Sequence, residues 1–248
     1  MKRLALLAVL FAPATALAEP LIKQPVASEL NFQMHPMAMM ALLAAMGLAP
    51  FVVLMLTSFA KMSVVLSITR NALGSPSLPP TTVLTGLAVI LSAHVMAPVA
   101  QDMYDLGKSA YTANASGDQI GDALHAATVA VVPLRNFLVK HGHEDDRAMF
   151  LSLAQQLRGP KRAAEVTEND LVVVVPAFVI SELKEAFQIG FLIFLPFLVV
   201  DMLVANVLMA LGMSTLSPTQ VSLPFKLLLF VMVDGWHLLA QGLVLGYR

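Results

Sequence analysis

The run SELKEAF at 181–187 places three charged side chains next to a long apolar stretch. Helical spacing puts Glu182 and Glu185 one turn apart, with Lys184 between them in the sequence. Paired carboxylates can give and accept protons in acid/base chemistry. The pattern favours a polar shoulder, where a helix leaves an apolar environment, over that chemistry. Charge pairing between subunits is the main alternative to the shoulder.

The rest of the apolar C-terminal third, 176–248, contains Asp201, Lys226 and Asp234. A carboxylate at the centre of a bilayer costs about 2.5 kcal/mol or more, so both acids should face a bundle interior or a wet cavity. A turn centred near Ser217 predicts the two acids at one depth, with Lys226 elsewhere. A base from another segment or subunit would then have to pair with them.

Other candidate chemistry is weaker. The run HGHEDD at 141–146 offers potential metal ligands, but we interpret it as a solvated loop that caps the next helix. His94 lies in an apolar helix, where a hydrogen-bonded core histidine is more common than a ligand or proton relay. The chain has no GxSxG, HExxH, Walker or GxGxxG motif and no cysteine. We therefore expect neither an enzyme nor a bound cofactor or metal.

The composition indicates an integral membrane protein. Hydrophobic residues make up 58% of the chain and charged residues 12%, against about 25% in soluble domains. The mean hydropathy is +0.77. The formal net charge of −1 argues against a nucleic-acid partner, which would require a basic face. These values predict an all-α fold of about four long, Pro-kinked apolar helices arranged as hairpins.

The N-terminal part divides into three segments. Residues 1–18 combine two basic residues, a short apolar stretch and a small-residue cleavage site, which is the pattern of a cleaved secretory signal peptide. Residues 19–36 then form a periplasmic N-terminal segment, and 37–98 form the first helical hairpin. Its first helix should run to a left-handed cap at Gly74. Its second helix should be capped by Thr81 or Thr82, span 83–97 and end before Pro98.

Residues 99–175 are more polar and predict a small helical insert in the periplasm. One helix is expected over 124–141, interrupted at Pro133. A second is expected to begin after Asp145 or Asp146 and to stop at Gly159.

Residues 176–248 predict the second hairpin, in which two apolar runs flank a small polar turn. Pro176, Pro196 and Pro224 should kink or end its helices. With the N-terminus outside, four crossings put the 57–82 loop and the 214–222 turn inside. The insert and the C-terminus then lie outside, although the insert carries more Lys and Arg than the inside loop, against the positive-inside tendency.

Four motifs in order resemble the SctR/FliP family of bacterial type III protein export. They are TSFAKMSVVLSITRNALG with the proline-rich turn after it (57–80), PAFVISELKEAFQIGF (176–191), LPFLVVDMLVANVLMALGM (195–213) and SLPFKLLLFVMVDGW (222–236). With the spacing between them, the resemblance covers nearly everything after about residue 45.

The resemblance implies a homopentameric core of the export gate in the inner membrane. It implies assembly with SctS/FliQ-like and SctT/FliR-like subunits, operation with SctU/FlhB-like and SctV/FlhA-like components, and unfolded proteins as substrates. It also implies that the hairpins are drawn into a largely extramembrane helical assembly around a narrow channel. The charges would then pair between helices or subunits, at these positions: Glu182, Lys184, Glu185, Asp201, Lys226 and Asp234.

The family closes its channel with a ring of methionines in the turn after the ALGM stretch. The matching residue here is Met213, followed by Ser214, Thr215 and Leu216. Members often carry several consecutive methionines, so Leu216 and Met209 are expected to share the seal. For the 15 methionines as a whole, adaptable packing between helices is the favoured interpretation over a channel lining.

The C-terminal sequence looks more like injectisome members, whereas a signal peptide is more typical of flagellar ones, and we favour the injectisome. Two other classes of function stay open from the residues alone. One is a small-solute transporter or channel that uses Asp201 and Asp234 as a midplane site. The other is an intramembrane hydrolase built on His94 and a carboxylate.

Overall fold

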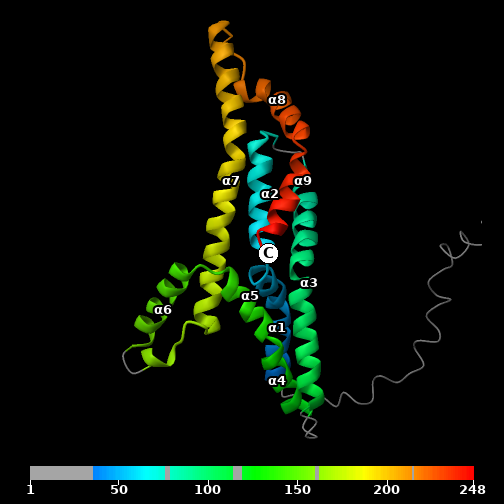
Figure 1. The fold of residues 1–248 in the computed structure, drawn as a ribbon, viewed down its shortest axis with the longest axis vertical. Helices are drawn as coiled ribbons and strands as arrows, with labels where there is room; N and C mark the ends of the chain where they lie inside the picture. Colours follow the sequence, from blue (N-terminus) through cyan, green and yellow to red (C-terminus); the bar gives the residue numbers. More distant parts are fainter. Residues whose placement is uncertain (1–35, 76–78, 114–118, 160–161, 214) are drawn as a thin grey trace, which may run out of the picture. The chain divides into compact units, whose positions relative to one another are not determined.

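A computed structural model describes residues 36–75, 79–113, 119–159, 162–213 and 215–248. All regular structure within these ranges is helical (Figure 1). The elements, in chain order, are α1 (Pro36–Met55), α2 (Phe59–Ala72), α3 (Thr81–Ala113), α4 (Gln119–Ala130), α5 (Val132–His141), α6 (Glu144–Arg158), η3 (Ala163–Glu165), α7 (Leu171–Ala210), α8 (Pro218–Met232) and α9 (Gly235–Leu245). The expected all-α class is therefore confirmed.

The chain divides into two compact units, residues 1–48 and 49–248. In the first unit the described residues form the beginning of α1, and their described side chains are exposed. The signal peptide and most of the N-terminal segment expected from the sequence lie outside the described residues.

Within the described residues, α3 and α7 are each long and apolar enough to cross a membrane. Two bent pairs raise the number of crossings to four if each pair forms one span. Residues 46–55 and α2 meet at a bend of 66°, and α8 and α9 meet at 60°. The four expected hairpin helices are thus two continuous helices and two broken ones.

The first break lies at Thr57 and Ser58, where the sequence predicted a continuous helix to Gly74. The Thr57 hydroxyl donates to the carbonyl of Leu54 and accepts the N–H of Phe59, both at 3.4 Å. Ser58 donates instead to Ser92 of α3 at 3.1 Å. Hydroxyl side chains that bond locally compete with the helical backbone, so the helix ends and restarts here.

The second break lies at Asp234, inside the predicted run from 221 to 245. Asp234 adopts the left-handed conformation with φ of 52°, which Asp tolerates better than most residues. Gly235 follows, and a Cβ there would lie 2.3 Å from the ring of Phe230. The chain bends at this point because Phe230 packs directly on the glycine backbone.

Proline did not end helices where the sequence suggested it would. α3 continues through Pro98 to Ala113, so the predicted end before Pro98 is wrong. Likewise α7 continues through Pro176 and Pro196 for 40 residues. Packing explains the continuation of α3, because its second half lies against α4, with Gly107 closely facing Ala130. These contacts with α4 hold the second half of α3 in a helix, although Pro98 removes one backbone hydrogen bond.

The glycine stops and the Pro133 interruption are observed as predicted. Gly74 and Gly159 take left-handed φ values of 78° and 69° just after α2 and α6. α4 and α5 separate next to Pro133, which occupies the first turn of α5. The residue before α6 is His143, so neither Asp145 nor Asp146 is its N-cap.

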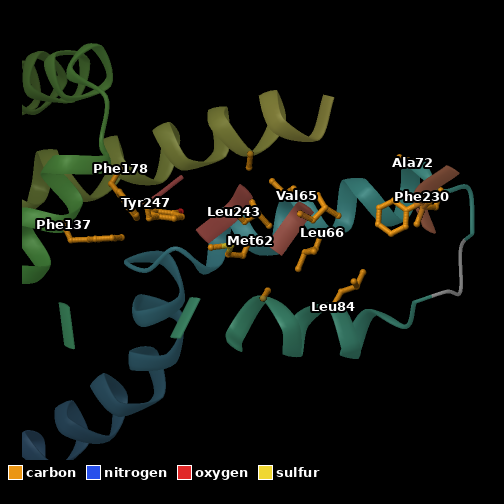
Figure 2. Packing of buried hydrophobic residues seen from close by; sticks show 14 of the residues in the cluster. Met62, Val65, Leu66, Ala72, Leu84, Phe137, Phe178, Phe230, Leu243 and Tyr247 are labelled. Atoms are coloured by element: carbon orange, nitrogen blue, oxygen red, sulfur yellow. The ribbon is translucent and has the colours of Figure 1, made fainter. Parts of the chain in front are cut away.

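The core of the second unit forms around α2, which packs against both α7 and α3 (Figure 1). Met62, Val65 and Leu66 of α2 are fully or almost fully buried. Figure 2 shows them near Leu84 of α3 and Leu243 of α9. Burying a side chain of this size contributes about 1.5–3 kcal/mol, so α2 is the central stabilising element.

Candidate functional site

A buried ion cluster joins α2 to the middle of α7. Lys61 Nζ lies 2.9 Å from Glu182 Oε1 and 2.6 Å from Glu185 Oε2. The Lys61 side chain is 3% exposed and that of Glu182 is fully buried, whereas Glu185 is one-third exposed. The spacing of three residues along α7 puts both carboxylates on the face that meets α2. Water is excluded from the Lys61–Glu182 pair, so removal of either partner would leave an unpaired buried charge and lower the stability of the fold.

Tyr247 adds a third component to this cluster. Its hydroxyl donates a hydrogen bond to Glu182 Oε2, and its ring lies 4.1 Å from Lys61 Nζ in a cation–π contact. The ring also stacks on Phe137 of α5 and meets His141 edge-on. Burial and the neighbouring Glu182 raise the pKa of the Tyr247 phenol, so it stays a proton donor. The segment after α9 is thereby fixed to α2, α5 and α7.

A second polar contact docks α6 on α7. Ser181 donates to Asp146 Oδ2 at 2.7 Å and accepts the backbone N–H of His143 at 2.9 Å. Lys184 Nζ lies 3.5 Å from Asp146 Oδ1. The Ser181 hydrogen bond, helped by Lys184, lowers the pKa of Asp146. His143 also bridges to Glu185 at 3.2 Å, so the two clusters are continuous.

A third contact closes the α7–α8 hairpin. Lys226 Nζ lies 2.6 Å from Asp201 Oδ2 and donates to the carbonyl of Ala72 at 3.2 Å. Ser222 donates to Asp201 Oδ1. The expectation that Lys226 lies away from both acids is therefore wrong for Asp201. The depth estimate assumed a turn centred near Ser217, whereas α7 ends at Ala210 and α8 begins at Pro218, so the turn is centred about three residues earlier and Asp201 lies opposite Lys226.

Asp234 has a different environment. It is exposed, occupies the bend between α8 and α9, and forms no salt bridge within the described ranges. Its backbone N–H donates to the carbonyl of Val231. Asp201 and Asp234 are thus separate features of the chain rather than a matched pair of acids.

The turn between α7 and α8 presents apolar side chains to the outside. Met209 is 66% exposed, and Met213 and Leu216 are each 47% exposed. Gly212, with φ of 72°, ends α7, and the Met213 N–H donates back to the carbonyl of Leu208. Ser214 lies outside the described residues. The three predicted seal residues therefore share one turn, next to the Lys226–Asp201 closure.

The arrangement of long apolar helices, internal ion pairs and an exposed apolar turn agrees with a membrane component that assembles with other chains. Residues 42–243 match the model of the FliP family. The chain belongs to the FliP family. This family supplies components of type III secretion and flagellar export, and the resemblance seen in the four motifs is confirmed.

Curated relatives come from both kinds of system. The hypersensitivity response secretion protein HrcR of Ralstonia nicotianae is 44% identical over 211 residues, which is 85% of this chain and 97% of that protein. The Yop proteins translocation protein R of Yersinia pestis is 44% identical over 209 residues, 83% of this chain and 93% of the relative. The flagellar biosynthetic protein FliP of Caulobacter vibrioides is 41% identical over 245 residues, 99% of this chain and 89% of the relative.

Two residues of the Glu182 cluster were not among the predicted site positions, Lys61 in the first FliP-family motif and Tyr247 beyond the last one. Lys61 was visible as a lysine within an apolar run, which is a sign that a carboxylate must lie nearby. Tyr247 gave no such sign, because a tyrosine at the end of an apolar helix is common at membrane boundaries. Both were missed because their partner, Glu182, is distant in the sequence.

The HGHEDD run of this FliP-family chain serves packing rather than forming a cluster of ligands. His141 lies against Phe137 and Tyr247, with ring centroids 4.7 and 5.0 Å away. Burial, together with the nearby lysines, lowers its pKa to about 4. Within the described ranges no group of three or more His, Asp and Glu side chains is arranged to hold a metal ion.

Proposed function

We propose that the chain is a core subunit of a type III export gate that conducts unfolded proteins across the bacterial inner membrane. Several copies would form a ring, with five as the expected number. The ring would assemble with SctS/FliQ-like and SctT/FliR-like membrane subunits and work with SctU/FlhB-like and SctV/FlhA-like components. Membership in the FliP family is the observation that carries this proposal.

The exposed turn supports a channel role. A ring of copies would bring Met209, Met213 and Leu216 together several times around one axis. Methionine side chains are flexible and can adapt to partners of many shapes. Such a ring can close around an unfolded chain of any sequence and still exclude water and ions.

The charge pairs support assembly rather than solute binding. A small-solute transporter would need Asp201 free to bind its substrate or ion. In the structure Asp201 already pairs with Lys226 and accepts from Ser222. Three of the four remaining charges of the proposed set, Glu182, Lys184 and Glu185, also contact partners within the chain, whereas Asp234 forms no salt bridge within the described residues. We propose that they fix each subunit in the shape that the ring requires.

An injectisome is the favoured setting. Relatives named for hypersensitivity response secretion, from Ralstonia, and for translocation of Yop proteins, from Yersinia, match at 44% identity. A flagellar export gate is the second candidate, and one observation favours it. The match to the Caulobacter FliP covers 99% of this chain, against 85% and 83% for the Ralstonia and Yersinia relatives. In either setting we propose a cleaved signal peptide and a periplasmic insert.

Native mass spectrometry of the detergent-extracted protein tests the assembly. The chain is measured alone and after co-expression with SctS/FliQ-like and SctT/FliR-like subunits. A ring of identical copies that captures both partners is the expected result. A stable monomer or dimer that ignores them would overturn the proposal and favour a solute transporter.

The seal is tested by the change Met213→Ala in cells that express the whole gate. Truncating the side chain should open a gap, so the ion permeability of the membrane should rise above that of the parent. Met202→Ala is the matched control, because Met202 is exposed to a similar degree but lies on α7 away from the turn. Lost secretion without any leak for Met213→Ala would contradict the seal.

A further inference from the structure

An open cleft of about 680 Å³ lies between α3 and α5. Its lining is mainly apolar and includes Val99, Leu106 and Phe137. The lining also carries charges of both signs, with Asp102 and Asp105 on α3 and Lys140 on α5. Such a cleft suits an amphipathic partner with apolar side chains between charged ends.

Within the described residues, the charged side chains that line the cleft are free to pair with another chain. Asp102, Asp105 and Lys140 form no salt bridge within the described residues. His141, beside Lys140, has a pKa lowered to about 4 by burial and by the neighbouring lysines, so it is neutral near pH 7. Lys140 therefore supplies positive charge to the α5 wall of the cleft, and Asp102 and Asp105 supply negative charge to the α3 wall.

A complementary feature lies on α6 of the same chain. Met149, Leu153 and Leu157 are four residues apart and form one stripe along the helix. They are 44%, 42% and 88% exposed. α6 begins with three acidic residues, and it is not among the described helices that are long and apolar enough to cross a membrane. An exposed apolar stripe between polar ends marks an interaction site.

The charges of α6 match those of the cleft at both ends. Asp145 lies in the first turn, and Arg158 lies in the last turn, about 20 Å away at 1.5 Å per residue. Neither forms a salt bridge within the part of the chain that the structure describes. Asp145 can meet Lys140 while Arg158 meets Asp102 or Asp105. That pairing also fixes the direction in which α6 would enter.

We propose that the stripe of α6 in one copy docks into the α3–α5 cleft of the next copy. The two surfaces differ and belong to one chain, which is the heterologous arrangement that closes into rings. This contact rests on the proposed function, since it assumes a ring of identical subunits. In this contact, one copy contributes α6 of its 99–175 insert, and the next copy contributes the cleft between α3 and α5.

Disulfide cross-linking in the co-expressed complex tests the contact. The chain has no cysteine, so any disulfide comes from engineered positions. Leu153→Cys and Val132→Cys, which replaces an exposed residue of the cleft, are placed in two differently tagged copies. Oxidation should join one tag to the other in the mixed sample, and neither variant alone should cross-link. Thr112→Cys, exposed on α3 outside the cleft lining, is the control partner for Leu153→Cys.

The outcomes separate the two proposals. A cross-link formed by Leu153→Cys alone would show a symmetric contact and overturn the docking. A ring seen by native mass spectrometry without the mixed cross-link would overturn the docking and leave the export gate standing. The absence of any ring would count against the proposed function itself.

A charge exchange provides an independent readout. Lys140→Glu should weaken ring formation by about 2- to 5-fold, the range expected for one exposed ion pair. Adding Asp145→Lys in the same chain should restore it, because each copy then offers the reversed pair to its neighbour. Failure of the second change to restore assembly, with both variants folded, would overturn the proposed register.

Discussion

α7 has two halves of similar apolar character and different surroundings. In the first half, up to Gly190, one face is buried against α2, α5 and α6, with Phe178 and Glu182 fully covered. In the second half most large side chains are exposed, and Phe197 and Leu208 are the buried ones among them. The first half holds the chain together, whereas the second half offers surface to lipid or to other chains. Hydropathy alone does not distinguish these roles.

The largest expected effect is in the first half, from Lys61→Met. This change leaves Glu182 buried without its cation and should destabilise the fold by about 3–5 kcal/mol. Thermal unfolding of the purified protein in detergent measures the loss. Lys184→Met is the control, because half of the Lys184 side chain is exposed and its contact is longer. Equal stability of Lys61→Met and the parent would contradict the assignment of the stabilising contacts to the first half of α7.

An intermediate effect is expected at the boundary between the halves, from Gly190→Ala. The new Cβ would lie 2.5 Å from Ile68 Cδ1 and 3.1 Å from Ile68 Cβ on α2. Overpacking of this kind costs about 1–3 kcal/mol in unfolding free energy. Combining it with Ile68→Ala should recover part of the loss, which a double-mutant cycle of unfolding measurements would detect. Simple additivity of the two changes would contradict the predicted contact.

The smallest effect on the isolated chain is expected in the second half, from Leu203→Ala. Leu203 is 60% exposed, so the unfolding free energy should change by no more than about 0.5 kcal/mol. If this half contacts neighbouring subunits, the same variant should still reduce the amount of ring measured by native mass spectrometry. A large loss of stability with normal assembly would reverse the assignment of the two halves.

The all-α class and several helix ends could be predicted from the sequence, because they depend on local chemistry. Gly74 and Gly159 stop helices through their own backbone freedom. The breaks at Ser58 and Asp234 were missed, because they depend on contacts with Ser92 and on the packing of Phe230 against Gly235. The predicted helix end before Pro98 was wrong because it used only the local preference of proline, whereas packing on α4 continues the helix.

For the candidate site, residue types could be predicted but partners could not. Glu182, Asp201 and Lys226 stood out as charges within or beside apolar runs, and all three form buried or half-buried contacts. Their pairing depends on where α2 lies relative to α7 and where α8 crosses it. Neither follows from spacing along one helix. Lys61 and Tyr247 complete the cluster only through that tertiary arrangement.

The Lys61–Glu182 pair also has a consequence for the order of events during synthesis. Glu182 follows Lys61 by about 120 residues, and a bacterial chain grows at about 5–20 residues per second. For about 6–24 seconds, therefore, the lysine exists in a newly made apolar hairpin before its carboxylate has been translated. During that interval the charge must stay hydrated or be shielded by another protein. The early hairpin therefore lacks the carboxylate that balances this lysine, and the buried pair is complete only after α7 has been made.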